Sequence, residues 1–496
     1  ALVAARALGL DAGAFALDAA CASALYAVKL ACDRLHDRTA DLMLAGAVNG
    51  ADSLLVHSGF AAVSALSPTG RSRPFHREAD GLVPAEGAVL VTLMRLSDAL
   101  AAGRPVLAVI RGVGLGNDGR GSGFLSPDPA GQERAMRLAY ARAGVDPATV
   151  GLLECHATGT PVGDAAEIAS TARVFAGHPG LPIGSVKSNL GHLLAPAGGA
   201  GLLKAVDALR HGVRPPTLGA DDPTPELRGR PLRPLTEAEE WERGQGPRRA
   251  AVSAFGFGGT NAHLVVEEWR EDTAAVPPPP SPPPAPAPAG GPLAVVALAV
   301  RAGRDGGTGE FTAAVLGGRP DRAPRERVST GLDGLRFPPV DIEETLPQQL
   351  LVFDAAREAA RGVDLPRDRT SVHVGMGAEP CVTLFAWRRR IGVQWARAGL
   401  PLPPGPAGAL RDAVGDPPTP ASALGAMPNL VANRVSSQLD LRGPSLAVSR
   451  EEASGTAALR IAARALRAGE TDAALVGAVD LSHDAAHTAA LDALGR

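Results

Sequence analysis

The chain has 496 residues, of which 45% are hydrophobic, and its 49 basic and 52 acidic side chains leave a net charge of −3. This length predicts two or more domains with large cores, and the balanced charge gives no electrostatic basis for binding nucleic acid or an anionic membrane. The four cysteines lack metal-ligand spacing and no long apolar run is present, so we expect a cytoplasmic protein without disulfides, a metal site or a membrane span.

Residues 15–35 begin extended and apolar and continue as an amphipathic helix, because Leu25, Val28 and Leu35 recur at helical spacing. Cys21 lies at the junction. The unpaired N–H groups and the dipole of a helix N-terminus favour a thiolate, which is the nucleophilic form of cysteine. We therefore predict a reactive cysteine, and a buried structural cysteine is the alternative, since free cysteines are often buried.

The rest of the first 270 residues alternates strand and helix patterns, which predicts an α/β domain. Strands are expected at 40–48, 86–94, 105–113, 152–160 and 181–192, the last two running into loops, and helices at 131–143, from 163 and from 196. Asp164 is a candidate N-cap for the helix from 163. Residues 250–266 predict two strands joined by a glycine-rich turn.

A segment made almost wholly of Pro, Ala and Gly follows, and we expect residues 271–292 to be an extended linker. It separates a first domain (1–270) from a second (293–496). In the second domain, strands are expected at 292–300 and 370–377 and helices at 348–362 and 429–439. Because the sequence begins and ends inside patterned segments, we expect a window of a longer polypeptide.

The two domains repeat one another. Laid on residues 14–49 without a gap, residues 445–480 place Ser454 on Ser23 and Glu452 on Cys21. The same strand, turn, helix and strand are therefore predicted twice. A carboxylate is a far poorer nucleophile than a thiol, so the second copy is not expected to carry an acyl group.

A reactive thiol needs a base or a partner for an oxyanion, and histidine is the usual supplier. His156 and His192 follow predicted strands among small and polar residues, although each alone also fits a structural histidine. Lys187 could hold a histidine or keep it neutral, and the alternative is a lysine paired with Glu167. Phe257, between glycines, could gate a pocket or be an ordinary packed aromatic.

Four motifs at these positions resemble the β-ketoacyl synthases, the condensing enzymes of fatty-acid and polyketide assembly. They are Asp18-Ala-Ala-Cys21-Ala-Ser23, Glu154-Cys-His156-Ala-Thr-Gly-Thr160-Pro-Val-Gly-Asp164, Val186-Lys187-Ser-Asn-Leu-Gly-His192 and Phe255-Gly-Phe-Gly-Gly-Thr-Asn-Ala-His263. The resemblance covers about residues 1–269 and implies the thiolase-like fold, a layered α-β-α-β-α arrangement of two similar α/β halves. Only the later part of such a domain is present, followed by the opening part of a second.

The resemblance implies that Cys21 accepts the acyl chain and that His156 and His192 promote decarboxylation of malonyl-carrier protein and stabilise the enolate. Lys187 would support the region of His192. The backbone N–H groups of Cys21 and Phe257 would form the oxyanion hole. No cofactor is expected in this region, since the substrates would arrive on the phosphopantetheine of an acyl carrier protein.

Four residues are expected to bind substrate by the same resemblance. Thr158 and Thr160 would line the pantetheine channel, Phe257 would be the acyl gate, and Thr260 lies in the same motif. The sequence departs from the commonest family pattern beside the catalytic residues, which bears on substrate fit rather than on the reaction. The departures are Ala19, Ala22, Ala24, Cys155 and Ala157.

A condensing domain followed by a copy without the cysteine is similar to the ketosynthase–chain-length-factor pair. The run Ser449-Arg-Glu-Glu-Ala-Ser-Gly455 and the Pro-rich linker look most like the multidomain polyunsaturated fatty acid synthases of bacteria. The resemblance implies carrier, acyltransferase and dehydratase domains as partners, and a dimer or a pseudo-dimer of the two copies. Three alternatives stay open: a module that sets chain length without turnover, a ketosynthase of another iterative type I polyketide synthase, and a thiolase acting on CoA esters, which the Lys187 and His192 motif argues against.

Overall fold

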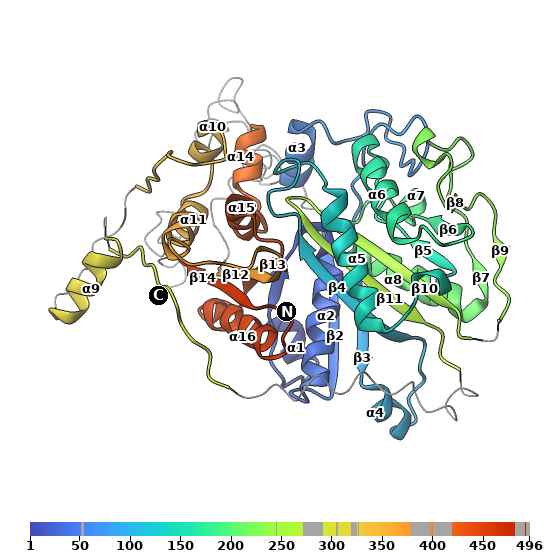
Figure 1. Ribbon diagram of the computed structural model, residues 1–496, viewed down its shortest axis with the longest axis horizontal. Coiled ribbons are helices and arrows are strands. Elements are labelled where there is room, and N and C mark those ends of the chain that lie inside the picture. The colour runs from blue at the N-terminus through green and yellow to red at the C-terminus, as the bar shows by residue number, and fades with distance from the viewer. Residues whose placement is uncertain are drawn as a thin grey trace.

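The structure is a computed structural model that describes residues 1–50, 54–244, 246–270, 291–303, 306–318, 327–377 and 419–481, together with residues 325, 397, 399 and 492. The predicted linker lies almost wholly outside the described residues. We call residues 1–270 the first segment and residues 293–496 the second segment. Figure 1 shows the two side by side.

The first segment contains a six-stranded sheet in the order β4-β11-β10-β5-β6-β8, in which β10 and β11 form an antiparallel hairpin. Its described elements are α1 (Leu2–Ala7), β1 (Ala16–Asp18), α2 (Ser23–His36), β2 (Leu42–Asn49), α3 (Leu54–Ala62), β3 (Gly87–Met94), α4 (Leu96–Ala101), β4 (Val109–Asn117), α5 (Pro129–Ala143), β5 (Leu152–Glu154), α6 (Pro161–Val174), β6 (Leu181–Gly184), α7 (Lys187–Leu190), α8 (Ala197–His211), β7 (Val213–Arg214), β8 (Leu232–Pro234), β9 (Glu239–Glu240), β10 (Arg249–Gly256) and β11 (Thr260–Glu267).

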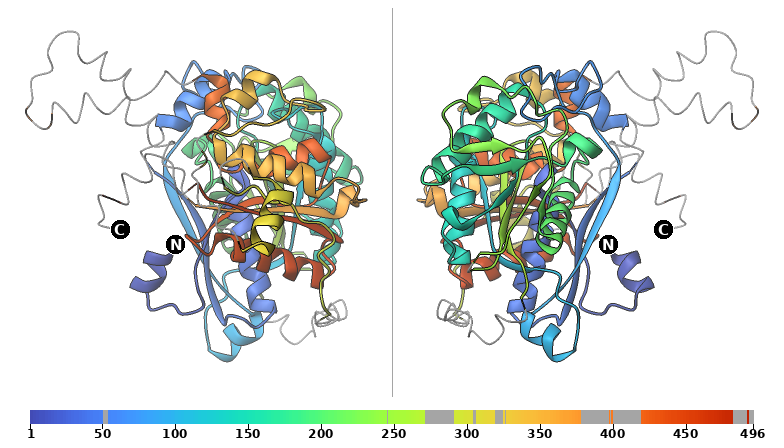
Figure 2. Two further views of the ribbon diagram at one scale, coloured as in Figure 1. Left: turned by 90° about the vertical axis from the view of Figure 1, so that its left-hand side faces the viewer. Right: turned by 90° about the vertical axis from the view of Figure 1, so that its right-hand side faces the viewer.

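The second segment adds strands that join β1 in a four-stranded sheet, in the order β1-β13-β12-β14. Its described elements are α9 (Thr308–Leu316), α10 (Pro339–Glu343), α11 (Pro347–Ala359), β12 (Thr370–Met376), α14 (Pro420–Gly425), α15 (Leu430–Leu439), β13 (Ser445–Ser449), α16 (Ser454–Arg467) and β14 (Ala473–Val479). Seen from the side, the strands of this segment lie beside the first strands of the chain (Figure 2).

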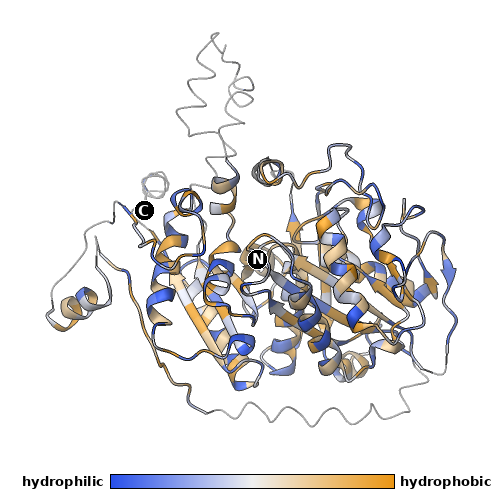
Figure 3. Cartoon of the chain, turned by 45° about the horizontal axis from the view of Figure 1, so that its top comes forward, coloured by the Kyte–Doolittle hydropathy of each residue, from blue (hydrophilic) through white to orange (hydrophobic). Residues whose placement is uncertain are grey.

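Alternating side chains of the six-stranded sheet build two separate cores. Leu152 and Val252 pack with α2 and α8 on one face, whereas Leu153 and Ala251 pack with α5 and α6 on the other. The core that holds α2 and α8 also takes in β13 and α16, and a third core joins β12 to α11 and α15. The order of layers is therefore α-β-α-β-α, as the sequence predicted. The strands are largely apolar and the outer helices carry polar faces (Figure 3).

The internal repeat is confirmed at the level of each element. Helices α2 and α16 are each 14 residues long, and they begin at Ser23 and at Ser454, which the repeat places on one another. Strands β1 and β13 pair antiparallel with Leu17 opposite Val448, its own counterpart in the repeat. The two copies therefore meet about an approximate two-fold axis that passes between these two residues.

Buried and half-buried ion pairs link α2 and α16 beneath this strand pair. Lys29 Nζ lies 2.6 Å from Asp33 and 2.9 Å from Glu470, and Arg464 pairs with Asp33 at 3.1 Å. Because each charge has an opposite partner, the interface between the segments can hold these groups away from water.

Two predicted strands differ in the structure. Residues 292–300 were expected to form a strand, but they form none, and Val295 is 86% exposed. A strand needs the backbone of a neighbour, and this run pairs with no described strand. The strand predicted at 40–48, whose apolar residues suggested a buried strand, exists as β2. Among the described strands it pairs with β3 alone, and Val48 near its end is 72% exposed.

Candidate active site

The backbone around Cys21 makes a tight elbow between β1 and α2. Ala20 adopts a left-handed conformation with φ of 51°, which is strained for a residue with a side chain. The hydroxyl of Ser23 accepts the N–H of Ala19 at 2.9 Å and donates to the carbonyl of Ala20 at 2.6 Å. A carboxylate oxygen of Asp18 accepts the N–H of Ala20 at 2.8 Å. Local hydrogen bonds therefore hold the thiol at the elbow.

The structure brings Cys21, His156 and His192 together from distant parts of the first segment. The sulfur of Cys21 and one ring nitrogen of each histidine all lie within 4.8 Å of one another. The two imidazole rings meet edge to face, with centroids 5.2 Å apart. These three are the residues that the sequence selected for a nucleophile and its partners.

The six-stranded sheet and its loops fix both histidines. His156 follows β5, and the carboxylate of Glu167 on α6 accepts the N–H groups of His156 and Ala157, each at 2.7 Å. His192 follows α7, and its Nδ1 accepts the N–H of Leu194 at 3.3 Å. Because Nδ1 is an acceptor, the proton of the neutral His192 ring resides on Nε2.

Burial is the main electrostatic influence on the two imidazoles. It lowers the pKa of His156 well below its usual value, and the charges of Lys187 and His192 lower it further. Burial followed by the Lys187 charge also lowers the pKa of His192. Both rings are therefore neutral at pH 7. As the sequence suggested, Lys187 acts toward keeping them neutral, although desolvation is the larger cause.

Lys187 forms no ion pair with Glu167 or with any other described carboxylate within 4.0 Å. Burial is the largest influence on the pKa of Lys187 and lowers it, whereas the charges of Glu154 and Glu167 raise it. Glu167 is occupied by backbone N–H groups, and Glu154 pairs with Lys204 at 2.6 Å. The proposed Lys187–Glu167 pair is therefore not formed. Lys187 remains a buried cation beside the histidines, with 3% of its surface exposed.

The expectation of a thiolate at Cys21 is wrong for the unliganded site. Burial raises the pKa of the Cys21 thiol to about 11, and this outweighs hydrogen bonding from the backbone N–H of Phe257 and the charge of Lys187, which both lower it. The argument from the helix terminus considered local dipoles and left out desolvation. The resting site holds a thiol that needs a base to take its proton.

We therefore expect the alkylation of Cys21 by iodoacetamide to accelerate about tenfold per pH unit up to about pH 10, beyond the range where an ordinary thiol levels off. Peptide mass spectrometry after timed labelling separates Cys21 from the other cysteines. Cys155 is the matched control, since it is 1% exposed and burial raises its pKa well above the usual value. A rate at Cys21 that is independent of pH above 7 would contradict this assignment.

Apolar side chains surround the thiol and leave a site suited to an acyl group. Cys21 packs in a cluster with Phe60, Leu82 and Leu194. The ring of Phe60 meets that of Phe257 edge to face, with centroids 6.0 Å apart. Phe257 therefore lies at the edge of this cluster, and its role as a gate stays a prediction.

The glycine-rich turn of the β10–β11 hairpin carries Phe257, and Gly258 and Gly259 adopt φ of 88° and 95°, as a turn of glycines permits. The hydroxyl of Thr260 is buried and donates to the carbonyl of Ala19 at 2.8 Å. Thr260 was predicted to bind substrate, and its contact in the structure is instead with the backbone under Cys21. This hydrogen bond ties the turn to the elbow.

A residue of the second segment holds the same turn, and no sequence pattern indicated this contact. The amide nitrogen of Asn429, at the start of α15, donates to the carbonyl of Phe257 at 2.8 Å. A Cβ on Gly258 would lie 2.5 Å from Leu430 Cδ2 and 2.8 Å from Asn433 Nδ2. The sequence predicted only a helix at 429–439 in this region, without indicating where it would pack.

Thr158 and Thr160 lie directly after His156, and their hydroxyl groups are 2.9 Å apart. Thr160 is the N-cap of α6, so the prediction that Asp164 caps this helix is wrong. Asp164 lies one turn inside α6, where its carboxylate accepts the N–H groups of Phe75, Thr158 and Gly159. Asp164 therefore shapes the loop that carries both threonines.

The second segment repeats the elbow without the thiol. Glu451 adopts φ of 51°, like Ala20, and the hydroxyl of Ser454 donates to its carbonyl at 2.6 Å, as Ser23 does in the first copy. Glu452 occupies the position of Cys21 and is exposed. The backbone of a nucleophile site is thus retained where no nucleophile is present.

The profile of the β-ketoacyl synthase N-terminal domain matches residues 1–99 and 333–495, and that of the C-terminal domain matches residues 107–221. A polyunsaturated fatty acid synthase of a Thraustochytrium species is 32% identical over 516 residues, which cover 96% of this chain and 24% of that protein. A mycocerosic acid synthase-like polyketide synthase of Mycolicibacterium smegmatis is 44% identical over 274 residues, which cover 54% of this chain and 13% of that protein.

The solved structure of the PfaC keto synthase–chain length factor superposes with a TM-score of 0.83 and 32% identity, and the match covers 98% of this chain and 55% of that one. The chain thus spans only part of the relatives that it matches. Among the described residues, no helix has the length and apolarity needed to cross a bilayer. The matches over both segments, together with the thiolase-like layers and the site around Cys21, show that the chain belongs to the β-ketoacyl synthase family.

Proposed function

We propose that the first segment is a β-ketoacyl-[acyl-carrier-protein] synthase, which joins a Cys21-bound acyl chain to malonyl-carrier protein by decarboxylative Claisen condensation. The cluster of Cys21, His156 and His192 carries this proposal, because it combines a nucleophile with two neutral imidazoles inside an apolar site. The substrates arrive on the phosphopantetheine of an acyl carrier protein in the cytoplasm.

The first step transfers the acyl group. The Cys21 sulfur attacks the thioester carbonyl of the acyl-carrier protein while a neutral imidazole takes its proton, and the carrier thiol leaves with a proton. The backbone N–H groups of Phe257 and Cys21, which both act on the Cys21 sulfur to lower its pKa, donate to the oxyanion. Thr158 and Thr160 line the approach of the pantetheine arm, and Phe257 opens it.

The second step breaks the bond between the malonyl carboxylate and its α-carbon. Carbon dioxide leaves, and the electron pair moves onto the thioester to form an enolate. Neutral His192 donates from Nε2–H to the enolate oxygen, and His156 donates beside it. Burial and the charge of Lys187 lower the pKa of both imidazoles, so after the proton has passed to the carrier thiol both rings are neutral donors in this step.

The third step forms the carbon–carbon bond. The enolate carbon attacks the carbonyl of the Cys21 thioester, the carbon–sulfur bond breaks, and the Cys21 thiolate that leaves is protonated by a proton from solvent. The product is a β-ketoacyl-carrier protein that is two carbons longer. We assign this chemistry to polyunsaturated fatty acid or polyketide assembly, because the relatives that match carry those names.

The experiment incubates the chain with acyl-carrier protein and ¹⁴C-labelled malonyl-carrier protein and follows labelled β-ketoacyl-carrier protein. We expect a product that requires both carriers. Acceptance of the free CoA esters without a carrier protein would favour a thiolase, and acyl loading without elongation would favour a length-setting module. The position of Glu452 supports that non-catalytic role for the second segment, paired with the first as in a ketosynthase–chain-length-factor dimer.

A further inference from the structure

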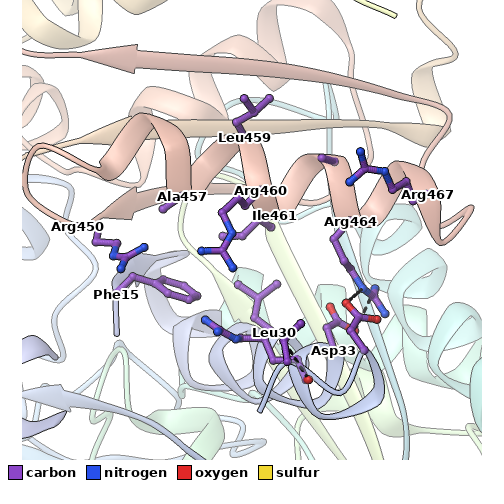
Figure 4. Close-up of a pocket in the computed structure, with 14 residues that line it drawn as sticks. Phe15, Leu30, Asp33, Arg450, Ala457, Leu459, Arg460, Ile461, Arg464 and Arg467 are labelled. Carbon is purple, nitrogen blue, oxygen red and sulfur yellow. Dashed lines mark hydrogen bonds and ion pairs between the residues drawn. The ribbon is translucent and has the colours of Figure 1, made fainter. Parts of the chain in front are cut away.

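A cavity lies between α2 and α16, apart from the site around Cys21. Its volume is about 470 Å³. Phe15, Leu30 and Ile461 contribute apolar wall, and arginines from both segments surround it (Figure 4). None of these residues takes part in the chemistry proposed for the first segment.

The acidic side chains of this cavity already have partners. Asp33 and Asp37 both pair with Arg464, at 3.1 and 3.2 Å. Asp33 and Asp37 therefore neutralise the charge of Arg464, in ion pairs that join α2 to α16, and they form no ion pair with the other arginines of the cavity.

Four of those arginines have no carboxylate within 4.0 Å among the described residues, and three of the four, Arg34, Arg450 and Arg460, lie close enough for their charges to interact. One nitrogen of Arg34 donates to the carbonyl of Ala12 at 2.7 Å, but its Nε is buried and has no hydrogen-bond partner in that part of the chain. The charges of Arg460 and Arg450 both act on Arg34, after burial, to lower its pKa. The guanidinium groups thus repel one another across a cavity without a counter-ion from the described protein.

Figure 4 shows Arg450 beside Phe15, and Arg460 extending from α16 toward Leu30 of α2. The positive groups and the apolar wall therefore belong to one space. A carboxylate suits the planar, forked donors of guanidinium groups, and an alkyl chain suits the wall. A simple inorganic anion would bind the guanidinium groups but not the apolar wall, and a long-chain alcohol would bind the wall but not the guanidinium groups.

We propose that this cavity binds a medium-chain fatty acid, with its carboxylate among Arg34, Arg450 and Arg460 and its alkyl chain along Phe15, Leu30 and Ile461. The inference is independent of the reaction at Cys21. The ligand bridges α2 and α16, so its binding reinforces the contact between the two segments.

Equilibrium dialysis of the whole chain with ¹⁴C-decanoate tests the proposal. We expect saturable binding at one site per chain, displaced by unlabelled decanoate. Decanol and inorganic phosphate, which each lack one half of the ligand's chemistry, should displace it about tenfold less effectively. Absence of saturable binding, or displacement by phosphate as effective as by decanoate, would overturn the proposal.

Arg460→Gln should weaken decanoate binding about tenfold and, without ligand, leave the melting temperature unchanged or higher, because it removes one of three repelling charges. Arg104→Gln, an exposed arginine on the first segment, is the matched control and should change neither quantity. Arg450→Gln provides a second test if the first variant folds poorly. Unchanged binding in both variants, or lower stability accompanying weaker binding, would assign these arginines a structural role and overturn the proposal.

Discussion

Cys21→Ala is expected to abolish acyl loading and condensation, by at least about a thousandfold, and to leave decarboxylation of malonyl-carrier protein measurable. The sulfur is the only atom of this side chain that can form the thioester. His156, His192 and Lys187 stay in place, because alanine fits the elbow, whose geometry depends on Ser23 and Asp18 rather than on the thiol. Intact-protein mass spectrometry reports the acyl adduct, and release of ¹⁴CO₂ reports the second activity.

Cys32→Ala is the control, since Cys32 lies on the helix that follows the elbow and outside the thiol's apolar cluster. It should load acyl groups at the rate of the unaltered chain. An acyl adduct that persists in Cys21→Ala, or one that disappears in Cys32→Ala, would remove Cys21 from the role of nucleophile.

Asn429→Ala is expected to slow acyl transfer to Cys21 by about ten- to a hundredfold, although Asn429 belongs to the second segment. Its amide holds the carbonyl of Phe257 at 2.8 Å, and only 3% of its surface is exposed, so its loss leaves that carbonyl unpaired at a cost of about 1–3 kcal/mol. The N–H of Phe257 then loses its fixed direction toward the sulfur. Asn429→Asp should be at least as slow, because a carboxylate faces the carbonyl oxygen without a proton to donate.

Comparing acyl transfer with decarboxylation in Asn429→Ala distinguishes loss of the position of Phe257 from general destabilisation of the protein. Decarboxylation depends on His156 and His192, which are held by Glu167 and by the loop to Leu194 rather than by Asn429, so it should change by less than about threefold. Gln438→Ala is the control on the same helix, since that side chain is bonded, within the described part of the chain, to the backbones of Gly334 and Arg336 at the surface. Equal losses of both activities in Asn429→Ala would indicate a structural defect instead.

The sequence sufficed for features that depend on local pattern or on family motifs. Helix α2 and its counterpart α16 follow from apolar spacing and from the repeat, and the four motifs identified the residues that meet at the site. Asn429 and Phe257 are 172 residues apart, and their contact depends on how the segments pack. No pattern within either segment could indicate it.

Three wrong predictions have a common physical origin. Each was made from neighbouring residues in the sequence and left out the parts of the fold that pack around the residue concerned. The helix terminus beside Cys21 favours a thiolate, but full desolvation has the larger effect and raises the pKa to about 11. Residues 292–300 have strand composition, but strand formation requires a neighbouring backbone. Aspartate is a residue type favoured at helix N-caps, but the carboxylate of Asp164 instead accepts three backbone N–H groups, two from the preceding loop and one from Phe75.

The register of the β1–β13 pair, with Leu17 facing Val448, gives one polypeptide the geometry of a homodimer. In a true homodimer one gene encodes both subunits, so each mutation appears in both. Here the two copies are separate parts of one chain, and each can change alone. One half is free to lose its nucleophile and to specialise as a scaffold for the other. With Cys21 as the proposed nucleophile, this pair of segments holds one covalent acyl intermediate at a time.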